Sequence, residues 1–254
     1  MKLIFRFRSQ QFLFLLTGIA WLGAAGAALA DVLVMSDGRR LEGRVLGVQG
    51  STVQLQTQAG TIGWPLANVR EVQMPVPPEL GQAQQAFAAK DYNKALTLAR
   101  ALSDKFKGLP TDWAQLATGM LGDIYVATAD LAKAEAAYKE FQRLYPGGGS
   151  LQAEVGMARI AASKKDFATA KQKLEPVAEK AVKEKNVSRA HPNAIAYSQT
   201  FLVLGQVKES EGKHAEALED YLRTVAIFFH DPSAVTAAQE RADALRKEHK
   251  VTVP

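Results

Sequence analysis

The chain has 254 residues, of which 47% are hydrophobic and 22% are charged, and its formal net charge is +5. This length and composition exclude a disordered chain and allow a sizeable core with one additional small module. The charge gives little support to nucleic-acid binding, because Lys2, Arg6 and Arg8 lie in a first segment without acidic residues, and removing these three from the 31 basic residues leaves 28 against 26 acidic ones.

Residues 1–30 have the order of a secretory signal peptide. A basic start precedes an uncharged run, and Ala28 and Ala30 supply the small residues that a signal peptidase needs before Asp31. We therefore predict cleavage after Ala30 and an exported protein of the periplasm or cell envelope. The alternative is a retained anchor, because residues 12–30 are 19 uncharged positions and long enough to span a bilayer. The sequence contains no cysteine, which excludes a lipid-modified N-terminal Cys and disulfide bonds.

Residues 31–75 change to an alternating pattern that predicts short β-strands. Val53, Leu55 and Thr57 alternate with glutamines, as expected for a strand with one buried and one solvated face. Turn residues such as Gly38 separate the apolar runs. The expected strands cover residues 32–35, 39–48, 53–57, 62–66 and 69–72.

Five short strands joined by tight turns make this module similar to an SH3-like or Sm-like β barrel, with Gly43 and Gly47 at points of strong curvature. Sm-like barrels often bind RNA. Here the local basic cluster is small and favours a solvated face beside a turn, so no nucleic acid is expected as a partner. The cluster consists of Arg39, Arg40 and Arg44. A module of this size is near the lower limit for independent folding, so we expect it to pack against the first helices.

Residues 79–254 follow a proline-rich junction. They contain a short sequence pattern that recurs in one register and predicts the turns between paired helices. A turn residue is followed four positions later by alanine: Asp91 and Ala95, Asp130 and Ala134, Asp166 and Ala170, Lys213 and Ala217. An aspartate at a turn suits a helix N-cap, and alanine allows close helix approach. After Pro232, an amphipathic terminal helix is expected, with Ser233 as its N-cap and Ala234, Ala238, Ala242 and Leu245 directed inward.

One segment carries most of a 34-residue signature: Leu121, Gly122, Tyr125, Ala134, Tyr138 and Pro146, with Thr118 at the usual tryptophan position. The segment resembles a tetratricopeptide repeat (TPR). A second copy keeps Leu204, Gly205 and Tyr221. The resemblance implies a mainly α fold, in which an antiparallel helix-pair solenoid of about four repeats plus a capping helix follows the five-stranded β barrel.

In this family, ligands usually lie along the concave face that is lined by the first helix of each pair. The resemblance places these residues in a partner-binding groove: Leu80, Gln84, Phe87, Asp123, Val126, Gln152, Val155, Arg159, Gln199, Leu202 and Gln206. Phe87, Val126, Val155 and Leu202 would form a discontinuous apolar strip there. The alternative role for the apolar members is packing between neighbouring helices. Arg159 is the only basic residue of the set, which argues against a clamp for a C-terminal carboxylate.

The sequence shows no motif for catalysis, a cofactor or a metal. Its four histidines are scattered, and Gly147 to Ser150 follow an expected helix rather than a strand, which is the wrong context for a phosphate loop. We therefore expect no enzyme. The long insert at 179–193 is basic, which suits either a docking patch or a solvated helix extension.

The leading hypothesis is a non-catalytic exported scaffold or adaptor of a bacterial cell envelope that binds protein or peptide partners through the TPR concave groove. Membrane contact is expected only if the signal segment is retained. The alternative is a module that binds a cell-wall polymer through the β barrel, with the repeats as a spacer. A glycan site needs an exposed aromatic platform, and the barrel's candidate is Trp64, which lies in the inward row. A third hypothesis, an enzyme assembled from dispersed residues, requires a pocket with perturbed titrating groups.

Overall fold

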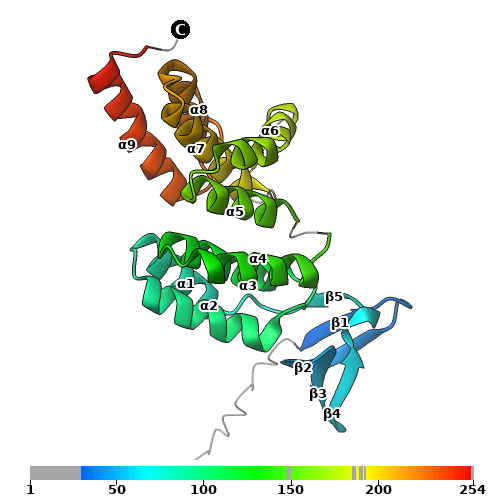
Figure 1. Cartoon of the computed structure of the whole chain (residues 1–254). Helices are drawn as coiled ribbons and strands as arrows, with labels where there is room; N and C mark the ends of the chain where they lie inside the picture. The colour runs from blue at the N-terminus through cyan, green and yellow to red at the C-terminus, as the bar shows by residue number, and fades with distance from the viewer. Residues whose placement is uncertain (1–29, 148–149, 185–186, 189–190, 192, 253–254) are drawn as a thin grey trace, which may run out of the picture.

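A computed structural model describes residues 30–147, 150–184, 187–188, 191 and 193–252. Within these ranges the protein is mainly helical, with a five-stranded antiparallel sheet followed by nine α-helices (Figure 1). The strands are β1 (Asp31–Met35), β2 (Arg40–Gln49), β3 (Thr52–Thr57), β4 (Gly60–Pro65) and β5 (Val69–Gln73). The helices are α1 (Pro78–Ala88), α2 (Tyr92–Phe106), α3 (Asp112–Ala127), α4 (Leu131–Leu144), α5 (Ser150–Ser163), α6 (Phe167–Lys183), α7 (Ala194–Ser210), α8 (His214–Ala226) and α9 (Pro232–His249).

The sheet is open, so the predicted closed barrel is wrong. Its strand order is β4-β3-β2-β1-β5, and among the described residues β4 pairs only with β3 and β5 only with β1. The helices explain why no closure is needed. Leu55 on the core face of the sheet belongs to the same buried apolar cluster as Leu80 of α1 and Phe106 of α2. Helices rather than the sheet itself thus cover most of the core face, up to the exposed Ile62 of β4, and the sheet and first helices share one core.

Four turns between paired helices have the same backbone geometry. In each turn a residue with positive φ precedes the residue that caps the next helix, and the N–H of the capping residue donates to a carbonyl five positions earlier. The positive-φ residues are Lys90, Ala129, Lys165 and Gly212. Asp91, Asp130 and Asp166 are the predicted N-caps, and each side chain accepts a hydrogen bond from a backbone N–H of its helix. The alanine four positions later is fully buried in all four pairs.

The helices pack mainly against their neighbours in the chain, and α1, α3, α5, α7 and α9 also form a row in which each contacts the next. Figure 1 shows the sheet at one end of the molecule and α9 at the other. The four predicted inward residues of α9 are buried. Its N-cap is Asp231 instead of the predicted Ser233, because the Asp231 carboxylate accepts from the backbone N–H groups of Ser233 and Ala234.

The predicted signal peptide, residues 1–30, lies outside the described residues except for Ala30. In the part of the chain that the structure describes, none of the helices combines the length and the apolar character needed to cross a membrane.

Candidate functional site

The predicted groove residues all lie on α1, α3, α5 and α7, but they differ in their exposure to solvent. Leu80, Asp123, Val155 and Gln199 are buried. Gln84 and Gln206 are exposed, and the remaining five, Phe87, Val126, Gln152, Arg159 and Leu202, are half-buried. A partner approaching this face would therefore meet the exposed and half-buried members first.

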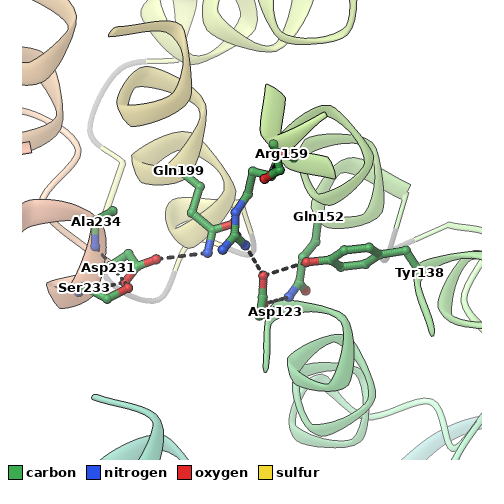
Figure 2. A network of polar contacts seen from close by, with 9 residues as sticks. Asp123, Tyr138, Gln152, Arg159, Gln199, Asp231, Ser233 and Ala234 are labelled. Carbon is green, nitrogen blue, oxygen red and sulfur yellow. Dashed lines mark hydrogen bonds and ion pairs between the residues drawn. The ribbon is translucent and has the colours of Figure 1, made fainter. Parts of the chain in front are cut away.

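Four polar members of the set converge on one network (Figure 2). The Asp123 carboxylate accepts hydrogen bonds from the Tyr138 hydroxyl at 2.7 Å and from Gln152 Nε2 at 3.2 Å, and it forms an ion pair with Arg159 Nη1. The same Nη1 atom donates to Gln199 Oε1 at 3.3 Å. The network therefore joins α3, α4, α5 and α7 through side chains that are 15 to 40 positions apart in sequence.

Asp231 extends this network to the start of α9. Gln199 Nε2 donates to Asp231 Oδ2 at 3.0 Å, while Oδ1 of the same carboxylate caps the helix. Asp231 therefore has two roles, since it ends the polar chain and fixes the first turn of α9 (Figure 2). We call the face formed by α1, α3, α5 and α7 the inner face. The inner-face network consists of Asp123, Tyr138, Gln152, Arg159, Gln199 and Asp231.

Small residues make room for the network between the helices. A Cβ atom at Gly122 of α3 or at Gly156 of α5 would overlap the Tyr138 ring, and one at Gly119 would meet the Gln152 amide at 2.7 Å. The two glycines around Tyr138 allow its ring to lie between α3 and α5, from where its hydroxyl reaches Asp123. The glycines that let the Tyr138 ring lie between α3 and α5 are therefore the same ones that allow its hydrogen bond to Asp123.

The inner-face network contains one cation and two carboxylates. Burial by itself would lower the pKa of Arg159, but Tyr138, Asp123 and Asp231 outweigh it and raise the pKa above its ordinary value. Burial, together with the adjacent Asp123 carboxylate, raises the pKa of Tyr138 well above its usual range. At neutral pH the arginine is therefore charged, and the tyrosine is neutral and donates its proton to a hydrogen bond.

Arg159 retains hydrogen-bonding capacity for a ligand. Its Nη1 atom makes both of its hydrogen bonds, whereas Nε and Nη2 make none with the described residues, and its side chain is 17% exposed. A guanidinium group has five N–H donors in a fixed plane. Chemically, the network offers an oriented cation beside amide groups, which suits binding of carbonyl oxygens.

The apolar members of the predicted groove are not brought together in the same way. Each packs with a different apolar cluster: Phe87 with the sheet and the first helices, Val126 with α3–α5, Val155 with α5–α7 and Leu202 with α8 and α9. Val155 is fully buried and faces no solvent. The face is therefore organised around polar side chains.

Two residues of the network, Tyr138 and Asp231, are not among the predicted groove residues. Tyr138 is one of the residues of the repeat signature, and Asp231 lies two positions before Ser233, the expected cap. A usable signal existed for Asp231, because Asp before Pro at the start of an amphipathic segment is a strong N-cap pattern. No local pattern indicates that Tyr138 reaches Asp123.

Comparisons with known proteins assign no family to the chain: its sequence matches no protein-family profile, and a search of curated proteins finds no match. Within the described ranges, no three His, Asp or Glu side chains gather in a way that could hold a metal ion.

Proposed function

We propose that the protein is a non-catalytic scaffold of the tetratricopeptide-repeat type that binds a protein or peptide partner along the face formed by α1, α3, α5 and α7. The observation that carries this proposal is the convergence of Asp123, Gln152, Arg159 and Gln199 from three helices on one network, with donors of Arg159 left over. A fixed guanidinium flanked by amides is suited to an extended peptide, whose backbone presents carbonyl oxygens at regular spacing.

The solenoid architecture is part of this proposal. It is supported by the four turns of equal geometry, by the row of contacts between alternate helices, and by the tyrosines that pack on a glycine of the preceding helix. Tyr138 lies against Gly122 and Tyr221 against Gly205, so two helix pairs use the same pair of residues for close approach. Recurrent interhelical contacts of this kind stack helix pairs into a curved array with an inner face.

Export to a bacterial cell envelope is also a proposal, and it depends on residues 1–30. Intact-mass measurement tests it, because cleavage after Ala30 gives a chain that begins at Asp31. A chain that still begins at Met1 and sediments with membranes would support the retained anchor instead.

Position-specific photocrosslinking tests the proposed binding face. A photoreactive residue at exposed Gln84 of α1 or Gln206 of α7 should form adducts with the partner in the producing cells. The matched control is Lys139 of α4, whose side chain is 65% exposed on a helix outside the row. Adducts from both inner-face positions and none from Lys139 would support the proposal. Equal adducts from all three positions, or adducts from Lys139 alone, would contradict it.

Charge substitution separates binding from folding. Val126→Asp and Leu202→Asp place carboxylates at half-buried positions of the same face. If the face binds the partner, these variants lose the adducts formed from Gln206 while circular dichroism shows that they remain folded. Loss of folding in both variants would show that the two side chains belong to the core.

The polymer-binding alternative gains no support from the described residues. The large hydrophobic side chains exposed on the sheet are Leu46 and Ile62, and neither is aromatic. Trp64 is half-buried, packs against the core, and has the Arg39 guanidinium 5.7 Å from its ring centre. An aromatic platform for a sugar ring is therefore not presented on this sheet.

A further inference from the structure

The two edges of the open sheet are protected to different degrees. Natural edge strands usually carry charged side chains, bulges or prolines that prevent pairing with another chain. The edge strand β5 contains exposed Arg70 and Glu71, and its register with β1 shifts between Val34 and Met35. The other edge strand, β4, contains no charged residue and pairs with β3 over six positions without a shift. Its single proline, Pro65, is the last residue of the strand and offers a further strand only its C=O group, because proline has no N–H.

The core face of the sheet is incompletely covered at β4. Ile62 lies opposite Leu55, which is fully buried, yet Ile62 itself is 41% exposed. Trp64 lies opposite the fully buried Val53, and its indole N–H is buried without a hydrogen-bond partner among the described residues. Apolar side chains at this edge therefore remain available to extend the core beyond the sheet.

The backbone of β4 also has groups directed away from the sheet. Leu66, directly after the strand, donates its N–H to Ser51 at 2.8 Å, and backbone groups alternate in direction along an antiparallel strand. Ile62 and Trp64 therefore direct their N–H and C=O groups toward β3. Thr61 and Gly63 direct theirs outward, where a further strand would meet them.

We propose that β4 pairs with β4 of a second copy of this chain, antiparallel and related by a two-fold axis at Gly63. This register places Ile62 of one copy opposite Trp64 of the other on the core face, so the same uncovered patch completes both copies. A two-fold interface brings identical surfaces together and therefore disfavours charged strands, and β4 is the uncharged edge. The result is one continuous sheet through both molecules.

The interface is small, so association is expected to be weak. A six-residue edge buries less than the roughly 1,200 Å² of a standard interface, and we expect dimers to appear between about 0.1 and 1 mM chain. Sedimentation equilibrium of the purified chain over about 10 µM to 1 mM should show the average mass rising from one chain toward two.

Two matched variants test whether β4 is the interface. Ile62→Lys places an inward-pointing charge on the edge strand and should weaken association roughly tenfold or more. Leu46→Lys makes the same change in the inner strand β2, at a side chain of similar exposure, 36% against 41%, and should dimerise like the unchanged chain. Thermal melts establish that both variants are folded. Equal association of the two variants would overturn the proposal.

Amide hydrogen exchange supplies a readout that needs no variant. With rising concentration, the outward amides of Thr61 and Gly63 should become protected, while those of Ile62 and Trp64, which already face β3, should not change. A mass of one chain at every concentration overturns the proposal. Protection of Thr61 and Gly63 only after addition of another protein also overturns it and assigns the edge to a strand of that protein.

Discussion

At Gly122 the lack of a side chain allows α3 and Tyr138 to lie in contact, because a Cβ atom there would overlap the tyrosine ring. Gly122→Ala should therefore lower the free energy of unfolding by about 1–3 kcal/mol, since the buried ring or the helices must move. Gly81 of α1 is a matched control because nothing lies within 4 Å of a Cβ at that position. Gly81→Ala should be neutral or stabilising by about 0.5–1 kcal/mol. Urea unfolding measures both, and equal midpoints would show that Gly122 is not at a helix contact.

Tyr197 of α7 gives a second residue-scale test, based on alkaline pH. Burial, followed by the neighbouring Glu184, raises the pKa of Tyr197 to about 12. A tyrosine in the unfolded chain loses its proton near pH 10. The stabilisation from neutral Tyr197 is therefore fully present below about pH 10 and is lost as the pH rises toward 12. Tyr138 and Tyr221 shift in the same direction.

We expect Tyr197→Phe to lose less free energy of unfolding than the unchanged chain between about pH 9.5 and 11.5, because phenylalanine has no proton to release. Urea titrations at several pH values give the free energy of unfolding against pH for both chains. Parallel curves would mean that the Tyr197 hydroxyl is equally ionised in the folded and unfolded states.

At the scale of elements, the Asp123–Arg159 pair joins α3 to α5, and both side chains are largely buried, with 8% and 17% exposed. Asp123→Leu and Arg159→Met should each cost about 2–4 kcal/mol, because each leaves one buried charge without its partner. The double variant should cost less than the sum of the two by about 1–3 kcal/mol. A double-mutant cycle by urea unfolding measures this coupling. Additive effects would show that the ion pair does not stabilise the contact between α3 and α5.

The sequence predicts individual elements well because their signals are local. The change of period after Asp31 marks the strands, and Asp91, Asp130 and Asp166 mark helix starts through caps that act within three residues. What could not be predicted depends on non-local packing. The core face of the open sheet packs against residues of α1 and α2, and Arg159 meets Gln199 only because α5 and α7 adopt a particular relative position. Helix pairs are specified locally, whereas the angle between successive pairs is not.

At the scale of the whole molecule, the apolar clusters follow one another along the chain, and their contacts decide whether the two ends unfold together. The first cluster joins the sheet to α1–α3, the second α3–α5 and the third α5–α7, while the last lies between α8 and α9. If the helices form the proposed solenoid, the stability of the molecule is the sum of local terms and contacts between neighbours. Trp113 belongs to the first cluster and Trp64 packs against it, so in a chain without Trp21 the tryptophan fluorescence reports on that end.

A pair of matched substitutions tests this arrangement. Leu102 of α2 is in the first cluster and Leu218 of α8 is in the last, and both side chains are buried. Each change to alanine should cost about 2–4 kcal/mol at its own site. In a chain with Trp21 replaced by Phe, Leu218→Ala should lower the urea midpoint seen by circular dichroism and leave the fluorescence midpoint nearly unchanged. Leu102→Ala should lower the fluorescence midpoint. If Leu218→Ala shifts both probes equally, the molecule unfolds as one cooperative unit, and a partner bound at either end of the array would stabilise all of it.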